Sequence, residues 1–307
     1  MMKLQRNVSL APKTTFKIGG KAQYFFVAKT KKDILGAFLY AKKLGIPFFI
    51  LGGGSNVLVS DKGFKGLVIQ ILNTKYQILD TRAYVEAGVL LPRLVRETTR
   101  RGLAGLEWAG GLPGTVGGAV RGNAGAFGKE TKDSVSYVDC IDSNGKVRKL
   151  SRTQCKFSYR SSVFKEKNWI VLGAAFRFKK GNAKILQSIA QDHIQYRKDR
   201  NPLEFPNAGS MFKNCDLKKV PKRFRDFVKP AVKTDPFPVV PTAFLIASAG
   251  LKGLRVGAAE VSQKHPNFLI NIGNAKAEDV KKLIQKVKQV IKKKFGIVLE
   301  EEVQSLE

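Results

Sequence analysis

Cysteine and histidine are scarce in this 307-residue chain, which has three cysteines and two histidines. Cys140, Cys155 and Cys215 have no paired spacing, which argues against a disulfide framework and against a zinc knuckle. His193 and His265 fit neither a metal-binding cluster nor a Ser/His/Asp arrangement, so no metal site is expected. So few cysteines suit a reducing cytoplasm.

Long apolar runs are absent as well. No stretch approaches the ~18 consecutive apolar residues of a membrane span. Residues 1–20 lack the apolar core and the cleavage site of a signal peptide. We therefore expect a cytoplasmic protein without a membrane partner. With 43% hydrophobic residues the chain can bury a core, and its length suits two or three domains.

Acidic residues are also few. The chain has 24 Asp and Glu against 55 Lys and Arg, which gives a formal net charge of +31. Such a charge is typical either of a nucleic-acid-binding protein or of a solvated basic surface suited to small anionic ligands. The basic residues are spread along the chain, and no nucleic-acid recognition motif is present. We favour the second interpretation and expect no nucleic-acid partner.

Hydrophobic spacing predicts mixed helices and strands without an internal repeat. Residues 31–44 carry apolar side chains at helical spacing before Gly45, and a short strand is expected over 46–51. A second amphipathic helix is expected over 277–295, ended by Gly296 and followed by a strand over 297–303. Further expected elements are strands at 57–59 and 84–87, helices at 91–101 and 185–200, and a hairpin within 137–176 that turns at 143–145.

Glycine, in contrast, is concentrated, with eight glycines among residues 110–128 and three in a row at 52–54. The first stretch also carries Trp108, Leu112 and Val116 in or beside it, and apolar residues at this density exclude a solvated linker. Neither stretch matches a P-loop or a dinucleotide fingerprint. Ordered main chain that presents N–H groups is suited to a pyrophosphate, so a nucleotide cofactor is expected, although glycine turns also serve packing.

Several motifs occur in an order that resembles one enzyme family, UDP-N-acetylenolpyruvoylglucosamine reductase, from about residue 14 to residue 303. The shorter type of this family, without an inserted tyrosine loop, is the better match. The motifs are TTFKIGGKAQYF, FILGGGSNVLVSDKGFKGLVI, GLEWAGGLPGTVGGAVRGNAGAFG, YRSSVFK, NAGSMFKN and VSQKHPNFLIN.

This resemblance implies an α+β protein with a two-subdomain FAD-binding fold of the vanillyl-alcohol-oxidase type and a C-terminal α+β substrate-binding domain. The expected ranges are 1–75 and 76–198 for the FAD-binding subdomains and 199–307 for the substrate-binding domain. The resemblance also implies FAD as cofactor, NADPH as co-substrate and a UDP-sugar as substrate, with a monomer favoured. The cofactor-binding residues it implies are Gly52, Gly53, Gly54, Ser55, Asn56, Gly111, Pro113, Gly114, Thr115, Gly117, Gly118, Asn123, Ala124 and Gly125.

The family's reaction reduces an enolpyruvyl double bond to a lactyl ether, and it requires charge stabilisation and a proton. By the resemblance, Arg160 stabilises the enolate-like charge, as a planar guanidinium suits, and Tyr159 contacts the substrate beside it. Ser210 matches the family's proton donor, and Lys213 and Asn214 follow it as substrate-binding residues.

Glu302 matches a late glutamate of the family, and Glu300 is the first substitute if that match is misplaced. Residue types alone also allow interpretations without a catalytic role. Arg160 could be a surface arginine, Ser210 part of a turn, and Glu302 part of a solvated acidic terminus. Two other function classes also remain open. A different FAD-dependent oxidoreductase of the same fold would keep the glycine loops, and a basic nucleic-acid-binding protein would need none of the three residues.

Overall fold

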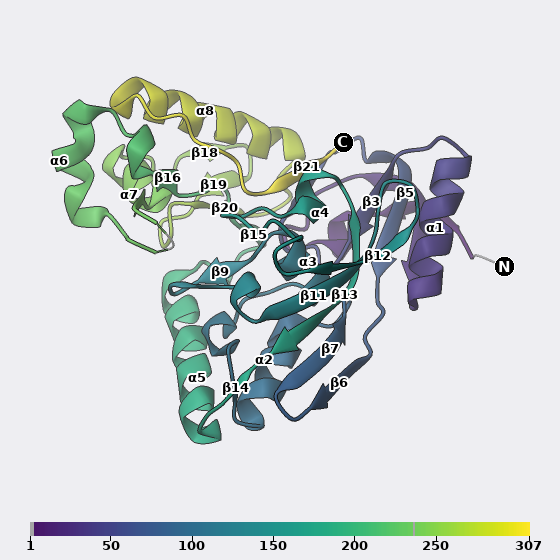
Figure 1. The fold of residues 1–307 in the computed structure, drawn as a ribbon. Helices are drawn as coiled ribbons and strands as arrows, with labels where there is room; N and C mark the ends of the chain where they lie inside the picture. The colour runs from purple at the N-terminus through teal and green to yellow at the C-terminus, as the bar shows by residue number, and fades with distance from the viewer. Residues whose placement is uncertain (1–2, 236) are drawn as a thin grey trace. The chain divides into compact units, whose positions relative to one another are not determined.

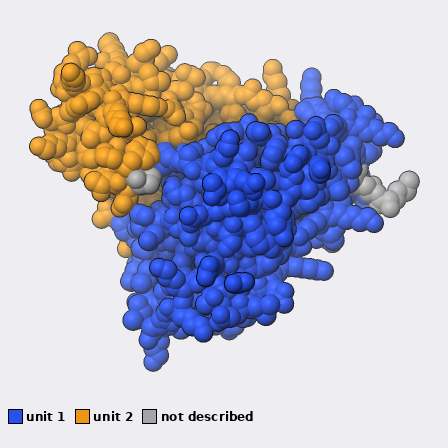
Figure 2. Space-filling model, viewed as in Figure 1, with its two compact units in different colours: residues 1–8, 22–53, 65–197 blue, residues 9–21, 54–64, 198–307 orange. Residues whose placement is uncertain are grey.

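The computed structural model describes residues 3–235 and 237–307 and divides the chain into two compact units (Figures 1 and 2). Unit 1 comprises residues 1–8, 22–53 and 65–197, and unit 2 comprises residues 9–21, 54–64 and 198–307. Each unit has its own hydrophobic core. The three predicted domain ranges are not tested by this division and remain a prediction.

Unit 1 contains two sheets. The first has the order β1-β2-β5-β3, with β3 and β5 parallel. The second is antiparallel and has the order β12-β11-β13-β7-β6. The strands are β1 (Gln5–Ser9), β2 (Lys21–Ala28), β3 (Phe48–Leu51), β5 (Phe64–Ile71), β6 (Tyr76–Leu79), β7 (Arg82–Glu86), β11 (Val135–Ile141), β12 (Val147–Ser151) and β13 (Ile170–Arg177).

Five helices and two short strand pairs complete the described part of unit 1. Strand β13 is buried over all but its last residue, which is expected of a strand covered on both faces. The helices are α1 (Lys31–Lys43), α2 (Leu91–Arg100), α3 (Val116–Arg121), α4 (Val163–Glu166) and α5 (Ala183–Arg200), and the pairs are β8 (Leu103–Ala104) with β14 (Lys179–Lys180) and β9 (Gly125–Ala126) with β10 (Lys129–Glu130).

Unit 2 is built on a four-stranded antiparallel sheet of order β15-β20-β19-β18, against which the long helix α8 (Ala277–Phe295) packs its apolar face. The chain's last strand pairs in parallel with β4, which is far away in the sequence. The elements are β4 (Val57–Val59), β15 (Asn207–Ser210), β16 (Cys215–Asp216), β17 (Val239–Val240), β18 (Arg255–Val256), β19 (Ala259–Val261), β20 (Phe268–Asn271), β21 (Gln304–Leu306), α6 (Arg225–Val228) and α7 (Thr242–Ser248).

Most predicted elements are confirmed within a few residues. Helix α8 ends at Gly296, which has φ +68° in the left-handed region that glycine tolerates. The hairpin β11–β12 turns at residues 142–146, where the Asp142 carboxylate accepts hydrogen bonds from the N–H groups of Asn144 and Lys146. Among residues 3–235 and 237–307, no helix combines the length and apolar character needed to cross a bilayer.

The predicted strand over 297–303 is wrong. Residues 297–300 have no regular structure, Glu301 forms one isolated bridge with Phe212, and the strand starts only at Gln304. No continuous strand forms because the segment changes its pairing partner along its length. Residues 300–302 bond to residues 211–213, whereas residues 304–306 pair with β4. An apolar pattern does not reveal which neighbour a terminal segment meets.

Helix α1 starts with a capping box, which gives a direct test of local stability. The Thr30 hydroxyl accepts from the N–H of Asp33, and the Asp33 carboxylate accepts from the N–H of Thr30. We expect Thr30→Ala to lower the free energy of unfolding by about 1 kcal/mol, whereas Thr30→Ser retains most of it. Urea denaturation followed by circular dichroism measures the difference, and equal stability of the two variants would contradict the cap.

Candidate active site

The two glycine stretches lie against each other within unit 1. A Cβ atom added at Gly53 would lie 3.1 Å from the Cα of Gly114, and one added at Gly52 would lie 2.6 Å from Thr115 Oγ1. The main chains therefore approach more closely than side chains allow. This contact between the two loops explains part of the glycine content. Packing was the alternative to cofactor binding that the sequence left open.

Helix α3 begins beside this contact. The Thr115 hydroxyl caps it by accepting from the N–H of Gly118 at 3.3 Å, and the N–H of Gly117 donates to the Ala87 carbonyl at 2.8 Å. A Cβ at Gly117 would lie 2.8 Å from the Cβ of Ala87, so protein packing requires this glycine.

Two other glycines of this segment have no such explanation. A Cβ at Gly118 would meet only Thr115 Oγ1, at 3.6 Å, and one at Gly122 would meet only the Gly118 carbonyl, at 3.5 Å. Glycine in a helix costs roughly 0.5–1 kcal/mol relative to alanine, yet no protein atom of the described residues requires it here. Bare main chain with open space in front of it fits a large ligand held at close range, as FAD requires.

Asn123 connects the glycine segment to the turn that carries Arg160. It is fully buried and has φ +42°. Its Nδ2 donates to the Ser158 carbonyl at 3.0 Å, and its Oδ1 accepts from the N–H of Lys132 at 3.1 Å. Both side-chain ends are thus engaged by main chain, which gives Asn123 a positioning role; its predicted contact with the cofactor remains a prediction.

Arg160 sits in a tight turn whose ends, Ser158 and Ser161, exchange two N–H to carbonyl bonds of 3.1 Å. The turn places Arg160 at φ +54°, an unusual conformation for a side chain of this size. Its guanidinium carbon lies 5.2 Å from the centre of the Tyr159 ring, and a Cβ at Gly125 would lie 3.3 Å from its Nη1. Unit 1 therefore brings Arg160, Tyr159 and Gly125 together, and their roles implied by the resemblance remain a prediction.

A second arginine, Arg197 of helix α5, lies on the same glycine segment. Its Nε donates to the Gly110 carbonyl at 2.9 Å, and its guanidinium carbon lies 5.4 Å from the centre of the Phe127 ring. Burial lowers the pKa of Arg197, and the charge of Arg160 adds to the decrease. Sequence reasoning missed this residue, because nothing in a lysine- and arginine-rich helix distinguishes one arginine before the fold is known.

In unit 2, one buried asparagine fixes the segment that follows Ser210. The Asn267 side chain accepts from the N–H of Phe212 at 3.1 Å and donates to the Phe212 carbonyl at 2.8 Å. Its own carbonyl accepts from the N–H of Met211 at 2.7 Å. Ser210 itself ends β15, opposite Phe268 of β20, so its main chain is held on one side by this pairing. Sequence reasoning did not single out Asn267.

The same segment holds Glu302. The N–H of Glu302 donates to the Met211 carbonyl at 2.8 Å, which places the two main chains side by side one residue after Ser210. Asn56 also bonds to this segment. Its Nδ2 donates to the Glu302 carbonyl at 3.2 Å, and its main-chain carbonyl accepts from the N–H of Gln304. Unit 2 thus brings Ser210, Glu302 and Asn56 together.

The two glutamates before Glu302 are engaged in ion pairs. Glu300 accepts from Lys219 Nζ at 2.5 Å and from Lys213 Nζ at 3.3 Å, and Glu301 accepts from Lys288 Nζ at 2.9 Å. The hydrogen bond from Lys219, aided by Lys213, lowers the pKa of Glu300. A carboxylate held ionised in this way is a poor proton source, which argues against Glu300 in that role; the assignment to Glu302 remains a prediction.

The remaining predicted residues lie beside these groups. Lys213, predicted to bind substrate, has its Nζ in the ion pair with Glu300, and its carbonyl accepts from the Thr242 hydroxyl at 2.6 Å. The Asn214 Oδ1 accepts from the N–H of Thr242 at 3.3 Å. Burial raises the pKa of Cys140 and Cys155 to about 12 and that of Cys215 to about 11, so these free thiols are unreactive.

Comparisons with known proteins agree with this arrangement. Residues 22–151 match the FAD binding domain family, and residues 201–306 match the C-terminal domain of UDP-N-acetylenolpyruvoylglucosamine reductase. The chain is 39% identical to the UDP-N-acetylenolpyruvoylglucosamine reductase of Caldanaerobacter subterraneus subsp. tengcongensis over 98% of its length and 93% of the relative's. It is 38% identical to that of Clostridium novyi, over 98% and 91%.

A solved structure extends the likeness to the fold. The crystal structure of UDP-N-acetylenolpyruvylglucosamine reductase from Thermus caldophilus matches with a TM-score of 0.79 and 31% identity, covering 100% of both chains. Glycine loops with open main chain, within a matched FAD-binding domain, define a flavin-dependent oxidoreductase. More narrowly, the chain belongs to the UDP-N-acetylenolpyruvoylglucosamine reductase family.

The contrast between Gly117 and Gly118 tests whether open main chain serves the cofactor. We expect Gly118→Ala to leave the free energy of unfolding of the FAD-free protein unchanged or up to about 1 kcal/mol higher, because helix propensity improves and space is available. FAD affinity should fall at least tenfold, measured by fluorescence titration.

Gly117→Ala is the matched control, because its methyl group would collide with Ala87. We expect it to lower the stability of the FAD-free protein itself. Undiminished FAD affinity in Gly118→Ala would show that this position does not face the cofactor.

Proposed function

We propose that this chain reduces the enolpyruvyl group of a UDP-N-acetylglucosamine enolpyruvyl ether to the lactyl ether of UDP-N-acetylmuramate, with NADPH as reductant, in peptidoglycan precursor synthesis. The observation that carries the proposal is identity of 39% with a named reductase over 98% of the chain. The fixed main chain around Arg160, Ser210 and Glu302 supports it, since each of these residues is held by hydrogen bonds within its own unit.

Bound FAD supplies the hydride chemistry between NADPH and the carbon–carbon double bond. The residues Gly52–Asn56 and Gly111–Gly125 would hold it, chiefly through main chain. Ser55 is proposed to donate to its phosphates. Open space at Gly118 and Gly122 supports this assignment.

Arg160 is proposed to neutralise the negative charge that grows on the substrate carboxylate side when hydride reaches the terminal carbon. A guanidinium forms two parallel hydrogen bonds to a carboxylate or an enolate, which a lysine cannot do. The turn between Ser158 and Ser161 supports this role, because it fixes the direction in which Arg160 leaves the main chain. Tyr159 is proposed to contact the substrate beside it.

Ser210 is proposed to donate a proton from its hydroxyl to the adjacent carbon, and Glu302 to orient or replenish that proton. A serine hydroxyl is a weak acid, so this step needs a strongly basic carbon and a site without bulk water. Lys213 and Asn214 are proposed to bind the substrate's diphosphate. We further propose that the protein acts as a monomer in the cytoplasm.

Replacing the proposed proton donor should separate the two half-reactions. We expect Ser210→Ala to retain reduction of bound FAD by NADPH within about twofold, while reoxidation by the enolpyruvyl substrate slows by at least about 100-fold. Stopped-flow absorbance at the flavin band measures both rates.

Ser305→Ala, which changes an exposed serine of β21, is the control and should leave both half-reactions unchanged. Equal losses in both half-reactions of Ser210→Ala would contradict the proton-donor role.

The choice between the glutamates can be tested in the same assay. We expect Glu302→Gln to slow flavin reoxidation by substrate at least tenfold, because the carboxyl group proposed to orient or replenish the proton is lost. Glu300→Gln should change this rate less than threefold and instead weaken the salt bridges to Lys213 and Lys219, whose side chains are partly exposed. The reverse order of effects would assign the carboxylate role to Glu300.

A further inference from the structure

A short part of unit 2 concentrates positive charge far beyond the chain's average. Residues 218–233, the basic segment, carry seven basic residues and one acidic residue, Asp226, which gives a net charge of +6 in 16 residues. All seven basic residues are exposed. The segment runs through 3-10 turns and α6, so its charges are held on ordered main chain.

Most of these charges are not neutralised within the protein. Lys219 pairs with Glu300, but within residues 3–235 and 237–307 no carboxylate lies at ion-pair distance from the other six cations. These six residues are Lys218, Lys222, Arg223, Arg225, Lys229 and Lys233. Mutual repulsion among them opposes folding, and a polyanionic surface would relieve it.

The basic segment also presents an aromatic ring. Phe227 of α6 is 45% exposed, although its ring stacks on Phe295 with the centres 5.5 Å apart. This stacking holds the exposed ring in place, and Arg225 and Lys229 flank it in the sequence. An ordered aromatic side chain between cations is the combination that peripheral proteins insert at the boundary between lipid head groups and acyl chains.

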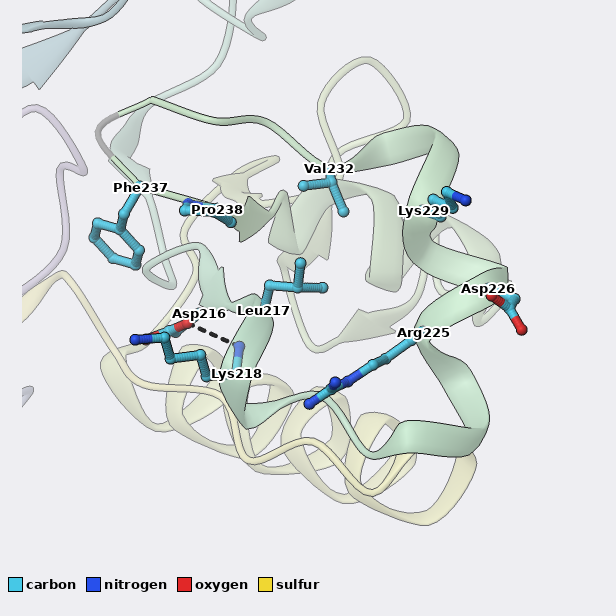
Figure 3. Close-up of a pocket in the computed structure, with 9 residues that line it drawn as sticks. All are labelled: Asp216, Leu217, Lys218, Arg225, Asp226, Lys229, Val232, Phe237 and Pro238. Carbon is cyan, nitrogen blue, oxygen red and sulfur yellow. Dashed lines mark hydrogen bonds between the residues drawn. The ribbon is translucent and has the colours of Figure 1, made fainter.

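The basic segment also lines an apolar hollow of about 700 Å³. Leu217, Val232, Phe237 and Pro238 surround it (Figure 3). The charged residues that also line it are Asp216, Lys218, Arg225, Asp226 and Lys229. Three cations and two carboxylates line this apolar recess, which adjoins the segment of net charge +6. Such a surface favours a partner that offers both negative charge and hydrocarbon. Nucleic acid offers charge and bases but no hydrocarbon, so these features together favour lipid.

We propose that the basic segment, with Phe227 and the adjoining hollow, docks unit 2 on a bilayer rich in anionic lipid. Clusters of four to eight basic residues bind such surfaces, with a contribution from each lysine or arginine that salt screens. The contact is peripheral, so it needs no membrane-spanning helix, and none occurs in residues 3–235 and 237–307. The proposal departs from the expectation, drawn from the sequence, that the protein has no membrane partner. It does not depend on the proposed reaction.

Flotation of the FAD-containing protein with vesicles tests this docking. We expect binding to vesicles of phosphatidylcholine with about 30% phosphatidylglycerol at 0.1 M salt, and none to pure phosphatidylcholine. The variant Lys222→Glu/Arg223→Glu/Lys229→Glu should bind at least about tenfold more weakly. Phe227→Ala should weaken binding about threefold or more even at salt that screens the charges.

The control variant Lys282→Glu/Lys286→Glu/Lys293→Glu makes the same charge change on exposed positions of α8. It should retain binding within about threefold, and FAD content reports folding of each variant. Equal losses in the two triple variants would assign binding to total charge and overturn the proposal. So would no binding to acidic vesicles, or binding only to a polyribonucleotide that the first triple variant abolishes.

Discussion

The close contact between the two glycine stretches of unit 1 is the constraint on which the proposed cofactor site depends. Main chain at Gly52 and Gly53 touches main chain and the capping residue at Gly114 and Thr115, so a single methyl group would separate them. The contact sets where α3 begins, and α3 carries the open positions Gly118 and Gly122. The glycines of this region therefore fall into two groups: several are required by packing, whereas Gly118 and Gly122 are not and are proposed to give access to the cofactor.

Two buried asparagines fix the main chain beside proposed site residues, as the glycine contact fixes the proposed cofactor segment. Asn123 ties the turn of Arg160 to the glycine segment, and Asn267 ties the residues after Ser210 to β20. Loss of such a bond leaves a buried main-chain group unpaired, at a cost of about 1–3 kcal/mol. Each asparagine thus contributes stability and fixes the main chain beside a residue to which we assign a role in the proposed reaction.

Two regions of unit 2 differ in how their positive charge is balanced. Near Glu302, lysines are paired with Glu300 and Glu301, so their charge is largely neutralised in place. Across the basic segment, cations other than Lys219 have no such partner among the described residues. The overall value of +31 conceals this difference. A single net charge therefore says little about partners, whereas its distribution over ordered main chain says more.

The sequence by itself determined the local elements and the family. Apolar spacing followed by a glycine predicted both α1 and α8, because these signals act between residues close in the chain. Ordered motifs along nearly the whole chain indicated the reductase family. Only the tertiary structure decided that 300–302 bond to 211–213 instead of forming a strand, that Arg197 reaches Gly110, and which glutamate is ion-paired. These outcomes depend on contacts between residues far apart in the chain, which no local pattern encodes.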